Sequence, residues 1–99
     1  MIKIIAVCGN GLGSSLVCQM AIDSVLKAIG VQAKVTHTDT TAISSMAADA
    51  DIIVSGANFK KLMEKKNLTV PIVYLNKLVD KQEITDKLRP ILVEMGVLE

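Results

Sequence analysis

The chain has 99 residues, a net charge of +1 and 51% hydrophobic residues, which predicts one small globular domain, 1–99, with a core of its own. It has one Tyr, one Phe, no Trp and no run of five basic residues, so it lacks the stacking aromatics and the basic stripe that nucleic-acid binding requires. No apolar stretch approaches the roughly 18 residues of a membrane span, and we therefore expect no nucleic-acid partner and no insertion into a membrane. Two cysteines without an export signal favour the reducing cytoplasm as the location.

The apolar pattern alternates between predicted strands and predicted helices four times along the chain. Short apolar runs predict strands, which lie at Ile2–Val7, Gln32–His37, Asp51–Ser55 and Pro71–Leu75. Longer amphipathic stretches predict helices, which lie at Ser14–Ile29, Thr41–Asp49, Phe59–Lys66 and Lys81–Met95.

Particular residues mark the ends of these helices. Gly30 is placed to end the first helix as a C′ glycine, and Thr40 to cap the second. Asp80 followed three residues later by Glu83 is typical of a capping box at the start of the fourth. Pro90 lies inside that fourth helix, so we expect a kink or an early break there.

The strand sequences indicate how the sheet is built. Strands one, three and four are nearly continuous apolar runs, as in strands buried on both faces of a parallel sheet, whereas strand two alternates and suits an edge. Alternating strands and helices predict an α/β fold with one open, four-stranded parallel sheet, order 2-1-3-4, and helices on both faces. In this flavodoxin-like arrangement the strand order reverses between strands one and three, where such sheets hold their ligands.

A cysteine on a glycine-rich turn follows the first strand at this reversal point. After Cys8 come Gly9, Asn10, Gly11, Leu12, Gly13, Ser14 and Ser15. The backbone N–H groups of such a loop and the N-terminus of the next helix can cradle an anion. The positive end of the helix dipole also stabilises a thiolate. Nucleophile and phosphate cradle thus occupy eight consecutive residues, which indicates an enzyme that carries phosphate on sulfur.

Three other kinds of phosphate loop fit this segment less well. A Walker A loop is excluded, because no lysine occurs between residues 4 and 26. A dinucleotide fingerprint would want Gly or Ala where Ser14 stands, and Asp39 lies too far along the chain to be its acidic residue. A low-molecular-weight tyrosine phosphatase, similar in layout, would have arginine at position 14 to grip the phosphoryl group. Without that arginine, a relay of phosphate is favoured over its hydrolysis.

With the segment from Cys8 to Ser15, the chain resembles the IIB component of the bacterial sugar phosphotransferase system, and is most similar to the ascorbate type. The resemblance implies that Cys8 accepts phosphate from a phosphohistidine on the IIA component. Cys8 would then pass it to a sugar bound by the membrane component IIC, with neither cofactor nor metal. Galactitol or lactose/cellobiose specificity remains an alternative, as do a cysteine phosphatase that lacks the arginine and a non-enzymatic regulatory module that holds an anion.

Several further residues have candidate roles. Cys18 is expected to fill the core. Asp39 is expected to be a turn residue, or to repel phosphate if it lies close to the loop. His37 ends the second predicted strand at the edge of the sheet where Cys8 lies, either as a base or phosphate donor or as a plain edge histidine. Three residues after strands three and four could line the rim of the site: Asn58, Phe59 and Asn76.

The first predicted helix supplies a candidate docking surface. If Gln19, Asp23 and Lys27 mark its wet face, the dry face is formed by Val17, Ala21, Val25 and Ala28. Leu12, Leu16 and Met20 then lie on or beside the wet face near the phosphate loop. We expect these three apolar residues to frame the surface that IIA and IIC share.

Overall fold

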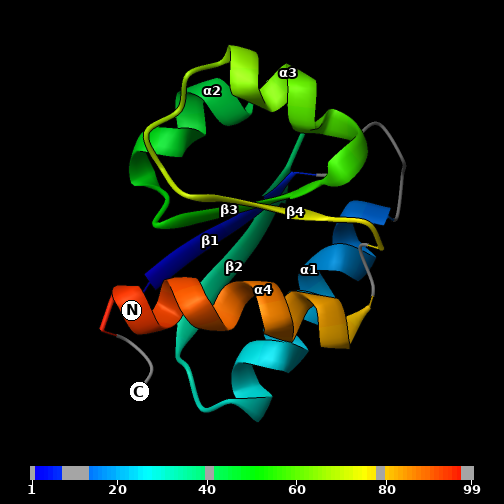
Figure 1. Ribbon diagram of the computed structural model, residues 1–99, viewed down its shortest axis with the longest axis vertical. Coiled ribbons are helices and arrows are strands. Elements are labelled where there is room, and N and C mark those ends of the chain that lie inside the picture. Colours follow the sequence, from blue (N-terminus) through cyan, green and yellow to red (C-terminus); the bar gives the residue numbers. More distant parts are fainter. Residues whose placement is uncertain (1, 8–13, 40–41, 78–79, 97–99) are drawn as a thin grey trace.

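The computed structural model describes residues 2–7, 14–39, 42–77 and 80–96. Its four strands are parallel and lie in the order β2-β1-β3-β4, which confirms the predicted topology (Figure 1). Each begins and ends within one residue of its predicted place: β1 (Ile2–Val7), β2 (Ala33–Thr38), β3 (Ile52–Gly56) and β4 (Ile72–Leu75).

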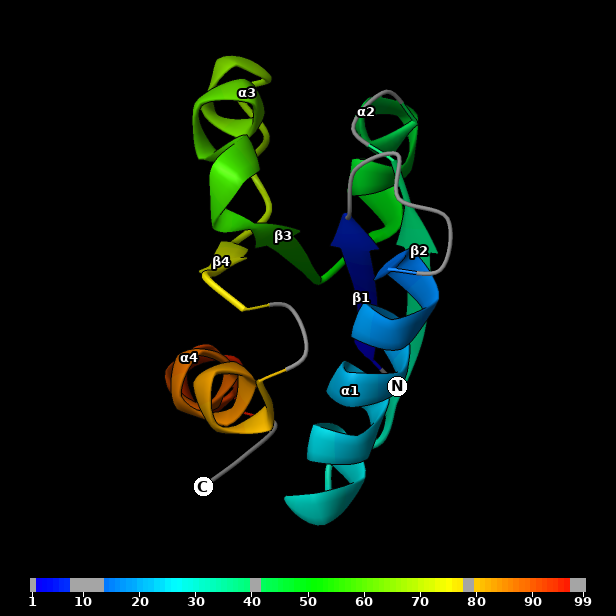
Figure 2. The ribbon, with the colours of Figure 1, turned by 90° about the vertical axis from the view of Figure 1, so that its right-hand side faces the viewer.

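Helices cover both faces of the sheet, as expected for alternating strands and helices (Figures 1 and 2). On one face lie α1 (Ser14–Ala28) and α4 (Lys81–Glu94). On the other face lie α2 (Ile43–Met46), which continues as the 3₁₀ turn Ala47–Asp49, and α3 (Lys60–Lys65), which follows the 3₁₀ turn Ala57–Phe59. The second predicted helix is thus part α-helix and part 3₁₀ turn.

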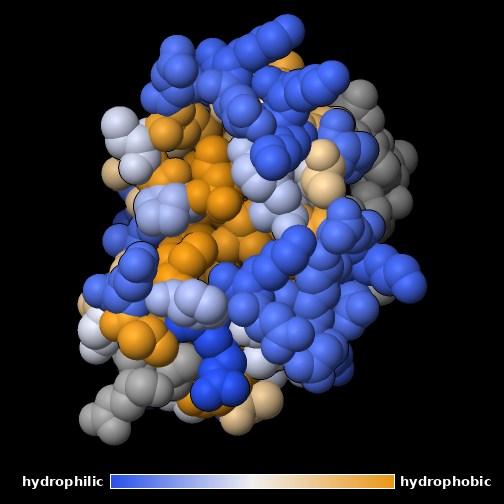
Figure 3. All heavy atoms as spheres, in the orientation of Figure 1, coloured by the Kyte–Doolittle hydropathy of each residue, from blue (hydrophilic) through white to orange (hydrophobic). Residues whose placement is uncertain are grey.

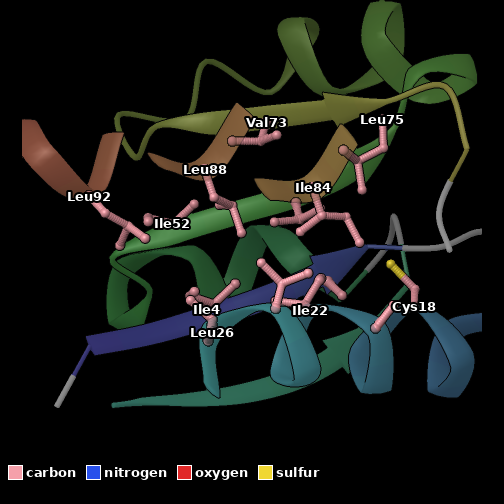
Figure 4. Packing of buried hydrophobic residues seen from close by; sticks show 14 of the residues in the cluster. Ile4, Cys18, Ile22, Leu26, Ile52, Val73, Leu75, Ile84, Leu88 and Leu92 are labelled. Carbon is pink, nitrogen blue, oxygen red and sulfur yellow. The ribbon is translucent and has the colours of Figure 1, made fainter. Parts of the chain in front are cut away.

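The two faces of the sheet carry two separate cores. The larger core lies under α1 and α4, where Ile22 and Leu88 meet Ile4 and Ile52 of the central strands, all four fully buried (Figure 4). The smaller core lies under α2 and α3 and is formed around Ile5, Val7, Ile43, Ile53 and Met63. The central strands β1 and β3 contribute to both cores, which explains their continuous apolar sequences.

The two edge strands differ from the central ones. Along β2, Ala33 and Val35 pack against the larger core while Lys34 is exposed, so the predicted alternation of an edge strand is confirmed. The opposite edge is β4, and Figure 3 shows apolar side chains on that side, between the layer of α2 and α3 and helix α4. Lys87 reaches this edge from α4 and donates a hydrogen bond to the backbone oxygen of Tyr74. A lysine at this place protects an exposed strand edge from pairing with other chains.

The end of α1 confirms the prediction for Gly30. This residue has a positive φ of 77°, and its N–H donates to the oxygen of Lys27 at 3.2 Å. The N–H of Val31 donates to the oxygen of Leu26 at 2.9 Å. These two bonds form a Schellman motif, and the apolar side chains of Val31 and Leu26 both belong to the larger core.

Helix α4 differs from the prediction in how its start is capped and in how far it continues. The carboxylate of Asp80 accepts from the N–H groups of Gln82 and Glu83, as an N-cap should. Glu83, however, accepts from the N–H groups of Asn76 and Lys77 instead of that of Asp80, so the reciprocal half of the box is not formed. Of the kink or early break predicted at Pro90, the break does not occur, since α4 continues to Glu94. Thr40, the predicted cap of the second helix, lies outside the described residues.

Candidate functional site

The four strands end almost level with one another at one edge of the sheet. Val7, the last residue of β1, is paired in register with Thr38 of β2 and with Ser55 of β3. Leu75, the last of β4, is paired with Gly56. The chain therefore leaves β1 at the middle of this carboxyl edge, with β2 on one side and β3 on the other. This is the reversal point at which open α/β sheets bind ligands.

The predicted nucleophile and most of its loop fall between described segments. Six of these residues lie outside the described part of the chain: Cys8, Gly9, Asn10, Gly11, Leu12 and Gly13. Ser14 and Ser15 are the first two residues of α1. Helix α1 thus begins seven residues after the end of β1. Its first turn contains no acidic residue, so no carboxylate in that turn opposes an anion at the positive end of the helix dipole.

His37 is held beside α1 near the carboxyl edge. Its ring nitrogen Nδ1 lies within hydrogen-bonding distance of Oε1 of Gln19, in the second turn of α1. The two side chains therefore join the edge strand to the helix whose first turn belongs to the predicted phosphate loop. Gln19, which sequence reasoning used only as a marker of the wet face, is the residue that fixes this imidazole.

The three predicted rim residues fall into two groups. Asn58 and Asn76 are exposed. Phe59 is half-buried and packs against the smaller core, so its packing role is clear. The loop after β4 is fastened by Glu83, whose two carboxylate oxygens each accept from one backbone N–H, those of Asn76 and Lys77, both at 2.9 Å.

Glu83 is therefore a structural clip for the loop at this edge. Its pKa is lowered to about 2 from an ordinary 4.5, chiefly by the hydrogen bond with Lys87 and then by the two backbone N–H donors. The ion pair with Lys87 spans 2.9 Å. The spacing of Glu83 and Lys87 on a helix was a sequence signal for the ion pair. No sequence signal predicted the hydrogen bonds that the two loop N–H groups donate to Glu83, because these bonds depend on how β4 and α4 meet.

Two further polar residues at the carboxyl edge have local structural roles. The carboxylate of Asp39 accepts from the N–H of Ala42 at 2.7 Å, which confirms the expectation of a turn residue there. Ser55 is fully buried, and its hydroxyl donates to the backbone oxygen of Gly56 at 3.2 Å.

The faces of α1 were predicted only in part. Cys18 is fully buried in the larger core with Ala21 and Val25, as expected (Figure 4). Val17 is 49% exposed and Ala28 is exposed as well, so the assignment of these two residues to the dry face was wrong. The buried face of α1 is instead formed around Cys18, Ile22, Val25 and Leu26. This face is rotated by about one residue from the predicted one, because the first two turns mix polar and apolar residues and do not define a face clearly.

Met20 is the one predicted docking residue that the structure describes in full. It is 62% exposed, next to the exposed Val17. Leu12 lies outside the described residues, and so does the side chain of Leu16. The described part of the chain contains no helix long and apolar enough to cross a bilayer. Nor do three His, Cys, Asp or Glu side chains of that part gather as a metal site would require.

Comparison with known proteins identifies the family. A model of the family described as "PTS system, Lactose/Cellobiose specific IIB subunit" matches residues 3–89. The ascorbate-specific PTS system EIIB component of Mycoplasma pneumoniae is 32% identical over 91 residues, which cover 92% of this chain and 95% of that protein. The ascorbate-specific EIIB component of Escherichia coli O157:H7 is 33% identical over 57 residues, or 58% of this chain and 56% of that protein.

Solved structures share the fold at low sequence identity. The lactose-specific IIB domain from Streptococcus pneumoniae matches with a TM-score of 0.65 and 15% identity, covering 99% of this chain and 98% of that one. The cellobiose-specific IIB protein from Borrelia burgdorferi matches with a TM-score of 0.62 and 20% identity, over 94% of this chain and 89% of that one. The family model that matches residues 3–89 and the similarity to the Mycoplasma pneumoniae protein show that the chain belongs to the IIB family and is a IIB component of a sugar phosphotransferase system.

Proposed function

We propose that this protein relays phosphate through Cys8 during sugar uptake. The observation that carries the proposal is the exit of β1 at the middle of the carboxyl edge, with β2 on one side and β3 on the other. The end of β1 lies at the ligand-binding position of an open α/β sheet, and the residue that follows Val7 in the sequence is a cysteine.

The chemistry is two successive transfers on one sulfur. The thiolate of Cys8 attacks the phosphorus of a phosphohistidine on IIA, so that a sulfur–phosphorus bond forms while the nitrogen–phosphorus bond breaks. A hydroxyl oxygen of the sugar bound by IIC then attacks the same phosphorus. The sulfur–phosphorus bond breaks, the thiolate is regenerated, and the hydroxyl proton is released.

Residues 9–15 are proposed as the phosphate cradle. Ser14 and Ser15 begin α1, whose first turn carries no acidic residue. Helix N-termini of this kind bind phosphate through unpaired backbone N–H groups. The missing arginine at position 14 favours a lasting phosphocysteine over hydrolysis.

For the sugar we propose L-ascorbate. The support is the name of the Mycoplasma pneumoniae relative, which aligns over 92% of the chain, whereas the matched family model carries lactose and cellobiose in its description. IIB components work with IIA and IIC partners, and for this chain we propose the cytoplasm as the place where they meet. Leu12, Leu16 and Met20 are the proposed docking surface, for which the exposure of Met20 is the available support.

The direct test is phosphorylation by a IIA protein charged with labelled phosphate. The wild-type protein should gain one label that survives acid and is removed by iodine. Cys8→Ser should gain none, while Cys18→Ser, altered in the larger core, should still accept it. A folded Cys8→Ser protein that still takes up label would overturn the relay, and wild-type protein that binds phosphate without covalent label would identify a regulatory module. Uptake assays with IIC and ascorbate, galactitol or cellobiose then assign the sugar.

A further inference from the structure

A pocket lies away from the carboxyl edge, between the first two strands and the layer of α2. Its volume is about 140 Å³, and it is lined by Lys3, Ile5, Lys34, Thr36, Met46 and Asp49. Lys3 precedes Val7 by four residues, so at about 3.3 Å per strand residue the lysine end of the pocket lies roughly 13 Å from the end of β1. We propose that this pocket binds a small anion that also carries a hydroxyl group, independently of the phosphate relay.

The two lysines are the first reason for an anion. Lys3 of β1 and Lys34 of β2 are paired in register, and both line the same pocket. Like charges opposite each other on neighbouring strands destabilise a sheet. Within the described ranges the ion pairs are Lys27 with Asp23 and Lys87 with Glu83, so neither Lys3 nor Lys34 has a carboxylate partner there. An anion between the two ammonium groups would remove their repulsion.

The other polar groups define what else the ligand carries. Neither the hydroxyl of Thr36 nor the carboxylate of Asp49 makes a hydrogen bond with any residue that the structure describes. Asp49 would repel a second negative group but can accept a hydrogen bond from a hydroxyl. The side chains of Ile5 and Met46 offer an apolar wall for a short carbon chain. A carboxylate or phosphate with a hydroxyl nearby satisfies all these groups.

The space in the pocket limits the size of the ligand. Its volume of about 140 Å³ is several times the roughly 10–15 Å³ of cavity that one water molecule needs. A three-carbon hydroxy acid or phosphate ester is of the fitting class. The test distinguishes a carboxylate from a phosphate ester by using D-glycerate as one probe and glycerol 3-phosphate as the other.

The test is titration of the full-length, ¹⁵N-labelled protein with D-glycerate, glycerol 3-phosphate or inorganic phosphate at constant ionic strength. We expect saturable shifts of the Ile5 and Thr36 amide signals with at least one of the two hydroxylated anions, and no shifts with glycerol. Lys34→Gln should weaken this binding at least tenfold. Lys61→Gln, which removes an exposed lysine on α3 outside the pocket, should leave it unchanged.

Thermal melting gives a second, opposite signature. Without added anion, Lys34→Gln should melt about 2–5 °C above the wild type, because one of two facing like charges is gone. With anion at a concentration that saturates the wild type, the wild type should gain more stability than Lys34→Gln, whose affinity is at least tenfold weaker. Shifts at Thr36 that are equal in both variants would overturn the proposal. So would shifts confined to residues 8–15, which would instead support phosphate binding at the predicted relay site.

Discussion

Nδ1 of His37 faces Oε1 of Gln19, so a hydrogen bond joins the edge strand β2 to the second turn of α1. An amide oxygen only accepts hydrogen bonds, and the neutral imidazole must therefore carry its proton on Nδ1. Nε2 is then left with its lone pair as an acceptor. The pairing fixes both the orientation and the tautomer of the only histidine in the chain.

The tautomer is directly measurable. We expect ¹⁵N NMR of the neutral ring to show the Nδ1–H form of His37 as the major species, and Gln19→Leu to abolish that preference. A double-mutant cycle with His37→Leu should give a coupling of about 0.5–1 kcal/mol. A dominant Nε2–H form would mean that the amide of Gln19 is turned around and donates to the ring instead.

Acid should weaken the clip formed by Glu83. Because the pKa of Glu83 in the folded protein is lowered to about 2 from 4.5, the ionised carboxylate stabilises the fold at pH values above 4.5. This contribution is lost as the pH falls through the range from about 4.5 to 2. Glu83→Gln should therefore unfold at lower urea concentration than the wild type at pH 7.

The difference between Glu83→Gln and the wild type should shrink steadily as the pH of the urea titrations is lowered from 5 to 2. Glu94→Gln serves as the matched control, since Glu94 is an exposed carboxylate at the other end of α4. A difference for Glu83→Gln that stays constant across this range would show that the clip does not depend on charge.

The sequence predicted those features that arise from local pattern. Apolar runs located β1 and β3 because strands buried on both faces leave little room for polar residues. Gly30 was found because only a residue without a side chain takes a positive φ at little cost. Contacts between particular side chains and neighbouring elements were not predicted. Glu83 had a cap-like spacing from Asp80, yet it binds the loop after β4, whose position is fixed only once α4 packs on the sheet.

The rotation of α1 shows the same limit within the candidate site. Val17 and Cys18 are neighbours of similar polarity, and the sequence pattern assigned both of them to the core side of the helix. Packing against α4 and the sheet buries Cys18 and exposes Val17. Likewise, the facing of Lys3 and Lys34 follows from strand register, which the sequence leaves open.

Gly30→Ala should destabilise the protein through the backbone alone. A Cβ built at Gly30 meets nothing within 4 Å, so the cost comes from holding a positive φ of 77°. We expect a loss of about 1 kcal/mol, or a melting temperature lower by about 4–8 °C. Gly30→Asn should lose less, because asparagine tolerates this conformation better. Equal melting temperatures for Gly30→Ala and the wild type would show that the Schellman motif contributes little to stability.

Met20 provides the sharpest test of the proposed docking surface. Its side chain is 62% exposed in the second turn of α1, one turn beyond the residues proposed to cradle phosphate. A lysine there should interfere with an apolar contact to IIA but leave the core untouched. We therefore expect Met20→Lys to lower the rate of phosphate transfer from IIA about tenfold at limiting IIA, with an unchanged melting temperature. The matched control is Val93→Lys, which changes a 48% exposed apolar residue near the end of α4 and should transfer at the wild-type rate. Equal rates for Met20→Lys and Val93→Lys would place the docking surface elsewhere, and a lower melting temperature for Met20→Lys alone would show that Met20 supports the fold.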